Sequence, residues 1–327
     1  MSQKICVISF DQWDYDHHIV KTLREKKIDA FHIKIKDFKH ETFFARITNT
    51  LSKVFLNNNP KKIKRQDYIL KKLEKKGFQD QILIINPELI DTKYHLEIKK
   101  HTHKYIAYLY DSVNRCSIEH LLDGIFDEIY SFDKNDIKQY NFKESSNYIY
   151  FKQKYALPKP TIDFIYLGSI DNRIAILNKM AKIFNKTNKK YQLYAIGKKA
   201  IVYKIKQFLL RKNKNIFFKT KKISQETALD LYKQSNIIID IVRENQIGLS
   251  FRIFEAMALG KKIITNNHNI ALYNFYNPNN IFIWDEKTTA LPSSFIKAEY
   301  QRIPNEIYLQ YTIDTWVENI FQLKKHN

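Results

Sequence analysis

Carboxylate and imidazole side chains gather near the start of the chain, directly after an apolar run. Groups of these types bind divalent metal ions or move protons in catalysis. Within this stretch, Asp14-Tyr15-Asp16 has the D-x-D form of a metal-binding motif. A three-residue pattern is weak by itself, so metal binding and proton transfer both stay open here. The residues concerned are Asp11, Asp14, Asp16, His17 and His18 of the stretch VISFDQWDYDHH.

Two further stretches carry residues suited to a phosphate group. LGSIDNR offers Gly168 and Ser169 for a close backbone approach to a ligand, and Arg173 as a cation. AIGKK places Lys198 directly after a glycine. An ordinary strand-to-helix turn would explain either stretch, so each signal is weak alone.

The strongest signal is the stretch ENQIGLSFRIFEAMALGKKIITNN. Backbone N–H groups of Gly248, Leu249 and Ser250 would open a helix and suit a pyrophosphate, with Arg252 as a cation nearby. Glu255 lies about two helical turns beyond Gly248 and could accept hydrogen bonds from a ribose diol. Because an acid in this apolar helix is costly to bury without a partner, a ligand role is plausible, and an ion pair with a lysine is the structural alternative.

Strands must position these loops, and short apolar runs alternate with helix-like stretches along the chain. This alternation predicts parallel sheets covered by helices on both faces, with ligands beyond the carboxyl ends of the strands. The expected strands are 4–10, 30–35, 81–86, 105–112, 128–133, 161–169, 191–197, 216–219, 237–242, 262–267 and 281–284.

The proline-bearing stretch KYALPKP interrupts the alternation, as segments between domains often do. We therefore expect an α/β fold with two tandem Rossmann-like domains, 1–153 and 154–311. The remaining residues, 312–327, are expected to form a helix that could pack back on the first domain.

Composition narrows the class of protein. The 327 residues suffice for two cores, and the two cysteines, Cys6 and Cys116, form no C-x-x-C pair. No apolar run approaches the roughly 20 residues that span a bilayer, and the N-terminus lacks the pattern of a secretory signal. We therefore expect a protein of the reducing cytoplasm.

The formal net charge of +21 comes mostly from lysine, and a genome-level bias toward lysine would explain part of it. Segment 46–76 combines ten Lys or Arg residues and several apolar ones with only Asp67 and Glu74. That mixture suits docking onto an anionic membrane surface, although a solvated helical face would explain it as well. The sequence shows no nucleic-acid-binding motif, so we expect no nucleic-acid partner.

The stretch GLSFRIFEAMALGKKIIT resembles the donor-nucleotide motif of GT-B glycosyltransferases, in which a glycine-rich turn precedes a helix whose glutamate binds the ribose. The stretches YLYDSVNR, FDEIYSFDKNDIKQYNF and NNHNIALYNFYNPNNIFI are similar to segments of a bacterial lipopolysaccharide or capsule biosynthesis group related to the CgeB-like glycosyltransferases. Large retaining families place a second glutamate eight residues before the ribose glutamate, where this sequence has Ile247. Because Glu244 is out of register, retaining and inverting transfer both stay open.

The resemblance implies a GT-B fold of two Rossmann-like domains facing a cleft, the N-terminal one binding the acceptor and the C-terminal one the nucleotide sugar. It implies a glycosyltransferase with no cofactor and no essential metal, so the metal interpretation of Asp14 and Asp16 is disfavoured. The donor is by default a UDP-sugar, and the acceptor a hydroxyl of a surface glycan or glycolipid such as lipopolysaccharide, O-antigen or capsule. Such an enzyme would be cytoplasmic, with peripheral association at the inner face of the membrane.

Inverting transfer needs a general base within hydrogen-bonding reach of the acceptor hydroxyl. Asp14 and Asp111 are our first candidates, followed by His17, although Asp14 or Asp16 would also serve as the N-cap of the first helix. Arg115, four residues past Asp111, could pair with it or with an anionic acceptor. Two alternatives remain: a nucleotide-sugar epimerase on the same fold, and a non-catalytic protein that binds a sugar nucleotide or an anionic polymer.

Overall fold

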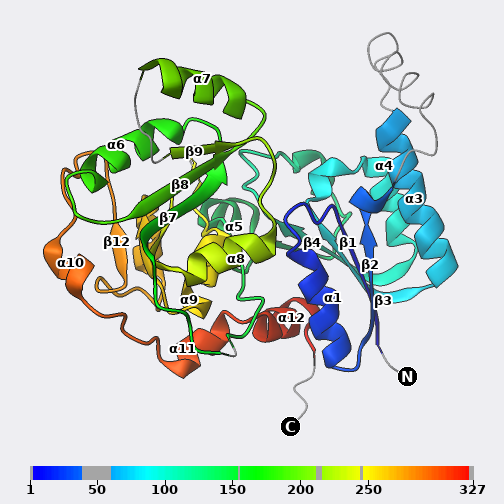
Figure 1. Cartoon of the computed structure of the whole chain (residues 1–327). Coiled ribbons are helices and arrows are strands. Elements are labelled where there is room, and N and C mark those ends of the chain that lie inside the picture. Colours follow the sequence, from blue (N-terminus) through cyan, green and yellow to red (C-terminus); the bar gives the residue numbers. More distant parts are fainter. Residues whose placement is uncertain (1–2, 39–59, 154, 211–215, 244–245, 324–327) are drawn as a thin grey trace. The chain divides into compact units, whose positions relative to one another are not determined.

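The chain forms two compact units, each with its own sheet and core (Figure 1). Unit 1 comprises Met1–Ser146 and Ile313–Asn327, and unit 2 comprises Asn147–Thr312. The domain boundaries expected after residues 153 and 311 stay predictions. The computed structural model describes residues 3–38, 60–153, 155–210, 216–243 and 246–323.

Unit 1 is built on a six-stranded sheet in the order β2-β1-β3-β4-β5-β6, with every neighbouring pair parallel. Its central strands are apolar on both faces because helices cover both faces of the sheet; Ile5, Cys6, Val7 and Ile8 are fully buried. The strands are β1 (Lys4–Ser9), β2 (Asp29–Lys34), β3 (Gln79–Ile85), β4 (Thr102–Leu109), β5 (Glu128–Ser131) and β6 (Lys143–Glu144). The helices are α1 (Asp16–Glu25), η1 (Ile35–Asp37), α3 (Pro60–Lys76), η2 (Pro87–Leu89), α4 (Thr92–Lys99), η3 (Glu119–Leu121) and α5 (Lys134–Tyr140).

The last helix, α12 (Ile313–Phe321), belongs to unit 1 and packs against α1. Lys26 Nζ, just past α1, lies 2.7 Å from Glu318 Oε1, and Gln81 Nε2 of β3 donates to the carbonyl of Phe321 at 2.9 Å. The apolar face of α12 is buried. These contacts join the end of the chain to the N-terminal sheet.

Unit 2 repeats the arrangement with a parallel sheet in the order β12-β11-β10-β7-β8-β9. Phe164, Ile165 and Tyr166 of β7 are fully buried at its centre. The strands are β7 (Ile162–Ser169), β8 (Tyr191–Ile196), β9 (Ile216–Lys219), β10 (Ser235–Asp240), β11 (Lys262–Thr265) and β12 (Ile281–Ile283). The helices are α6 (Ile174–Phe184), α7 (Ala200–Leu210), α8 (Gln225–Lys233), α9 (Phe251–Ala258), η4 (His268–Leu272), α10 (Ser293–Lys297) and α11 (Asn305–Gln310).

Two parallel six-stranded sheets with interleaved helices confirm the predicted α/β class with two tandem Rossmann-like parts. Strand ends differ from expectation: β4 begins at Thr102, because its polar first residues give no apolar signal, and β10 ends at Asp240. Within the residues that the structure describes, no helix is both long and apolar enough to cross a membrane.

The structure describes only part of the basic segment 46–76, since residues 46–59 lie outside the described part of the chain. The remainder is α3, which turns Ile69 and Leu73 into the core and presents lysines to solvent. These apolar residues of α3 are therefore already used for packing in unit 1.

Candidate functional site

The carboxyl edge of the unit 2 sheet is organised by Asp240, the last residue of β10. Its side chain is fully buried. Oδ1 accepts hydrogen bonds from Ser250 Oγ at 2.7 Å and from Arg252 Nε at 2.9 Å, and Oδ2 lies 3.4 Å from Thr265 Oγ1. Asp240 thus ties the end of its own strand to β11 and to the start of α9. A buried carboxylate is stable there because an arginine and a hydroxyl both contact it.

Ser250 occupies the N-cap position of α9, with extended backbone dihedrals, but its hydroxyl is turned away from the helix. It donates to Asp240 and makes no side-chain cap to the first turn of α9. Asn267 Nδ2 holds the carbonyls of Ile247 and Gly248, at 2.9 and 3.3 Å. The first turn of α9 therefore keeps N–H groups that its own N-cap side chain does not satisfy, which suits an anion at the positive end of the helix dipole.

Glu255 is buried on α9, one turn beyond that start. Its Oε1 accepts a hydrogen bond from the hydroxyl of Tyr150 at 2.6 Å. The sequence left open an ion pair between Glu255 and a lysine, whereas the hydrogen-bond donor in the structure is the neutral phenol of Tyr150. A tyrosine hydroxyl orients the carboxylate without neutralising its charge. Glu255 thus stays chemically suited to accept hydrogen bonds from a diol.

Arg252 joins the two central strands of the sheet. Nη1 donates to the carbonyl of Leu167 at 2.6 Å while Nε binds Asp240. Burial alone would lower the pKa of the Arg252 guanidinium, but the Asp240 carboxylate beside it raises that pKa above its ordinary value. The guanidinium also lies 5.7 Å from the centroid of the Tyr166 ring. Arg252 therefore positions the end of β7 relative to β10.

A second arginine cluster lies in the loops that follow β7 and β10. Arg173 donates to both oxygens of Asp171, at 2.8 and 2.7 Å, and to the carbonyl of Ile241 at 2.9 Å. Arg243 Nε reaches Asp171 Oδ2 at 3.1 Å, and its side chain is 40% exposed. Burial would raise the pKa of the Asp171 carboxyl, but the two arginines hold it below its usual value. Arg243 is the more open of these two cations.

The remaining predicted donor residues sit on neighbouring loops. Gly168 lies near the end of β7, and a Cβ there would come within 2.1 Å of the Tyr166 hydroxyl. The absence of a side chain at Gly168 thus makes room for Tyr166. Ser169 is the last residue of β7, and Lys198 is exposed in the loop after β8. Their roles in ligand binding stay predictions.

In unit 1 the D-x-D stretch forms a tight loop after β1. Asp11 and Asp14 both have positive φ angles, 44° and 59°. Asp14 Oδ1 lies 2.6 Å from Lys36 Nζ, which also donates to the carbonyl of Asp11 at 2.6 Å. Tyr15 occupies the N-cap of α1, so neither Asp14 nor Asp16 is its N-cap residue. Lys36 therefore fixes the loop and pairs with Asp14, one of the two first candidates for the general base.

Asp11 is the buried centre of this loop. Its Oδ1 accepts from the backbone N–H of Asp16 at 3.0 Å, while Oδ2 lies 3.0 Å from Lys34 Nζ and 3.9 Å from His17 Nδ1. Burial would raise the pKa of the Asp11 carboxyl, but the Asp16 N–H and Lys34 bring it below its usual value. Burial lowers the pKa of His17. Asp11 Oδ2 and His17 Nδ1 thus lie near each other without a hydrogen bond, and an imidazole beside a carboxylate is a group that can accept a proton.

Asp16 links this loop to β4. Its Oδ1 accepts from the hydroxyl of Tyr110 at 2.6 Å, and burial raises the pKa of its carboxyl to about 6. Asp111, the next residue after Tyr110, forms an ion pair with Arg115. Because β3 lies between β1 and β4, the strands that carry Asp14 and Asp111 are about 10 Å apart. Among the described residues, no three His, Cys, Asp or Glu side chains form a cluster that could hold a metal ion.

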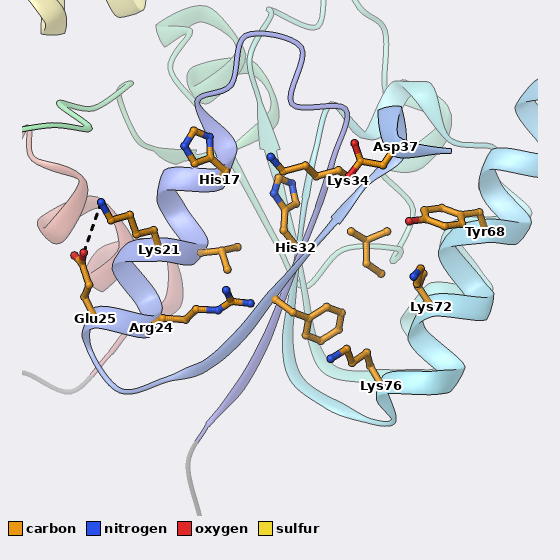
Figure 2. Close-up of a pocket in the computed structure, with 13 residues that line it drawn as sticks. His17, Lys21, Arg24, Glu25, His32, Lys34, Asp37, Tyr68, Lys72 and Lys76 are labelled. Carbon is orange, nitrogen blue, oxygen red and sulfur yellow. Dashed lines mark ion pairs between the residues drawn. The ribbon is translucent and has the colours of Figure 1, made fainter. Parts of the chain in front are cut away.

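A pocket of about 840 Å³ runs along the edge strand β2, between α1 and α3 (Figure 2). His17 of α1 lies at one end, beside His32 and Lys34 of β2. Burial lowers the pKa of His32 to about 4. The lining carries more positive than negative groups, which suits an anionic ligand. Its charged residues are Lys21, Arg24, Lys34, Lys72 and Lys76, with Glu25 and Asp37.

Sequence reasoning missed several residues of these clusters, among them Asp240, Arg243 and Tyr150. Asp240 and Arg243 lie at and just past the end of β10, so the rule that placed other candidates beyond strand ends could have found them. Tyr150 left no signal, because it lies 105 residues before Glu255 in an irregular stretch.

The chain is similar in fold, over nearly its whole length, to solved structures that include named glycosyltransferases. An alpha-glucosyltransferase in complex with UDP and a 13-mer DNA matches with a TM-score of 0.61 and 14% identity, covering 98% of each chain. The lipopolysaccharide outer core galactosyltransferase WaaB, in its apo form, matches with a TM-score of 0.53 and 14% identity, covering 99% of this chain and 96% of that one. The UDP co-structure of S. aureus MnaA matches with a TM-score of 0.54 and 13% identity, covering 99% and 98%.

No family model matches the chain, and no curated protein matches it in sequence. At identities this low the likeness shows the fold alone. That fold is the two-domain GT-B architecture, as the sequence predicted.

Proposed function

We propose that the protein is a glycosyltransferase that takes its sugar from a nucleotide-sugar donor bound by unit 2. The observation that carries the proposal is the start of α9, where the Ser250 hydroxyl is bound to Asp240 and does not cap the helix. A diphosphate at that helix start would receive backbone N–H groups, and Arg243 would supply a partly exposed cation. Glu255 would accept hydrogen bonds from the ribose hydroxyls.

UDP is the nucleotide we propose first, because three of the structural neighbours are complexes with UDP. The acceptor we propose is a hydroxyl of a bacterial surface glycan or glycolipid. The enzyme would belong to the CgeB-like group and act at the cytoplasmic face of the membrane. The similar stretches in the sequence support this, and so does the presence of the lipopolysaccharide galactosyltransferase WaaB among the neighbours. Docking through segment 46–76 stays a prediction from composition.

For the chemistry, we propose His17 as the general base. An acceptor hydroxyl in the pocket beside β2 would give its proton to the imidazole. Its oxygen would form the new bond to the anomeric carbon as the bond from that carbon to the diphosphate breaks. Asp11, 3.9 Å from His17 Nδ1, would stabilise the imidazolium that forms. The helix start and Arg243 would neutralise the leaving diphosphate, so we propose that transfer needs no bound metal.

The test is thermal unfolding with UDP, GDP, CMP, ADP and dTDP, each with Mg²⁺ or with EDTA. A ligand at a hundred times its dissociation constant adds about 2.7 kcal/mol, so the matching nucleotide should raise the midpoint by several degrees. A shift with one nucleotide that EDTA leaves unchanged is expected. A shift that needs metal would contradict metal independence, and no shift with any nucleotide would contradict the donor site.

Turnover then separates the catalytic candidates. With the matching UDP-sugar, donor hydrolysis or transfer should fall by orders of magnitude in His17→Gln, while the UDP-induced midpoint shift persists. Asp14→Asn and Asp111→Asn are measured beside it, and near-normal turnover would remove that residue from the candidates. Product analysis distinguishes transfer from epimerisation of the donor sugar, and no product at all would favour a binding protein.

A further inference from the structure

Helix α7 in unit 2 presents large apolar side chains to solvent. Only Ala200 of its eleven residues is buried, while Phe208 is 82% exposed and Leu209 is 71% exposed. Buried apolar faces are the rule for helices that pack on a sheet, and contiguous exposed apolar surface usually marks an interaction site. The exposed large apolar residues of α7 are Ile201, Val202, Ile205, Phe208, Leu209 and Leu210.

All of these residues except Leu210 form one stripe, because they follow the i, i+1, i+4, i+7, i+8 pattern of a single helix face. The opposite face is anchored to the protein. Tyr203 stacks on Phe218 with ring centroids 5.1 Å apart, and Gln207 Nε2 donates to the carbonyl of Ile216 at 2.9 Å. In Figure 1, α7 lies at the outer edge of unit 2, next to β9. The apolar stripe therefore faces away from the core of its own unit.

Among the described residues of α7 and of the loop before it, the charged side chains are all positive. Lys198, Lys199, Lys204 and Lys206 are exposed, the last two flanking the stripe on either side. The sequence contains no Asp or Glu from residue 172 to residue 225. A partner for this face must therefore accept apolar side chains at its centre and offer negative charge around them.

Helix α3 provides the contrast within the same chain. It too is rich in lysine, but its apolar residues Ile69 and Leu73 are packed into unit 1. Lysine content alone therefore does not create a face like that of α7. What distinguishes α7 is that both halves of an interfacial helix, the apolar stripe and the flanking cations, are exposed together.

We propose that α7 docks on an anionic lipid bilayer, lying in the plane of the surface. The apolar stripe enters the boundary between headgroups and acyl chains, and the lysines extend to the lipid phosphates. An interfacial helix with cations along both borders of its apolar stripe has this chemistry. The proposal is independent of the donor site and would hold for a protein that carried out no transfer.

Co-sedimentation of the full chain with vesicles tests the proposal. Vesicles of phosphatidylcholine with phosphatidylglycerol should bind the chain, and vesicles of phosphatidylcholine alone should bind it much less. The double variant Phe208→Ser and Leu209→Ser should lose at least about tenfold in apparent affinity. Matched substitutions at two other exposed leucines of unit 2, Leu272→Ser and Leu309→Ser, should bind like the wild type.

A charge variant gives a second, independent readout. Lys204→Glu with Lys206→Glu should weaken binding to the anionic vesicles, whereas Lys71→Glu with Lys75→Glu on exposed positions of α3 should weaken it less. Equal binding by the wild type and both α7 variants would overturn the proposal, and so would equal binding to both kinds of vesicle. If the wild type does not bind vesicles but is a dimer in light scattering, and the serine variant is a monomer, the apolar face of α7 would instead bind a second copy of the chain. The UDP-induced midpoint shift, measured on the same variants, should stay unchanged.

Discussion

Replacing Glu255 with glutamine tests whether its carboxylate binds the donor or only supports the fold. Glutamine keeps the length of the side chain and a carbonyl oxygen that can still accept from Tyr150, whose hydroxyl now lies 2.6 Å from Oε1. What it removes is the negative charge. If the ribose hydroxyls donate to this carboxylate, the substitution replaces charge-assisted hydrogen bonds with neutral ones.

The expected loss follows from the strength of such bonds. A charge-assisted hydrogen bond is about 1 kcal/mol stronger than a neutral one, so weakening the bonds from both ribose hydroxyls should cost about 2 kcal/mol, which corresponds to an increase of about 30-fold in the Kd for UDP. The free energy of unfolding without ligand should not fall by a comparable amount, because Glu255 is buried and glutamine needs no stabilisation of a buried charge.

Isothermal titration calorimetry with UDP measures the first quantity, and chemical denaturation without ligand measures the second. Tyr150→Phe serves as the matched control, since it removes the donor to Oε1 but keeps the charge of Glu255. This control should raise the Kd by no more than about tenfold, as expected for the loss of one orienting hydrogen bond. A Glu255→Gln variant that unfolds more easily but binds UDP like the wild type would show this explanation to be wrong, because the carboxylate would then only support the fold.

Three further predictions concern the residues that hold these sites. Gly168→Ala should lower the free energy of unfolding by about 1–3 kcal/mol, measured by denaturation, because the added Cβ would collide with Tyr166. Tyr166→Phe alone should leave the stability unchanged or raise it, since the buried Tyr166 hydroxyl has no hydrogen-bond partner in the described residues. Asp240→Asn should lower the free energy of unfolding by about 3–5 kcal/mol, because it leaves Arg252 without its buried counter-charge. Adding Arg252→Met should recover part of this loss, and equal stability of Asp240→Asn and the wild type would contradict the prediction. Burial raises the pKa of Asp16 to about 6 in the folded state, against 3.8 for a free side chain, so ionisation of this group destabilises the fold as pH rises from about 4 to 6. The stability of Asp16→Asn relative to the wild type should therefore increase by up to about 3 kcal/mol over this pH range. Parallel pH profiles of stability for the two proteins would contradict this prediction.

The fold was predictable because burial on both sheet faces leaves a strong mark on the sequence. Strands such as β1 and β7 are short runs of apolar residues between turn signals, and most of their side chains are buried. Strand ends were less predictable, since polar residues pair in the sheet without any apolar signal. The strand was expected over residues 237–242, whereas β10 ends at Asp240. The sequence therefore did not show that this aspartate lies at the end of a strand, next to the loops.

The motif around α9 gave the candidate donor residues, but not what their side chains contact. Arg173 and Arg252 were expected as cations for a phosphate, and the structure shows both paired with aspartates. Arg252 also holds a carbonyl 85 residues away, at Leu167, and no local pattern predicts such a distant contact. The sequence can therefore place a cation beside a strand end without showing whether an acid of the same protein already binds it.

On the acceptor side, the D-x-D letters directed attention to Asp14. The structure places Asp11 at the centre instead, buried and close to His17 and Lys34. Spacing along the chain could not distinguish them, because both aspartates lie in the same short loop and both have positive φ angles. Lys34 and Lys36 come from the end of β2 and the turn after it, which the sequence alone did not bring to this loop.

Hydrogen exchange with and without UDP is the most direct test of the donor site at α9. We predict that saturating UDP slows exchange of the backbone amides in residues 247–254, at the start of α9, where the N-cap hydroxyl leaves N–H groups for a diphosphate. Unchanged exchange in this segment at saturating UDP, or protection confined to other parts of the chain, would contradict the proposed donor site.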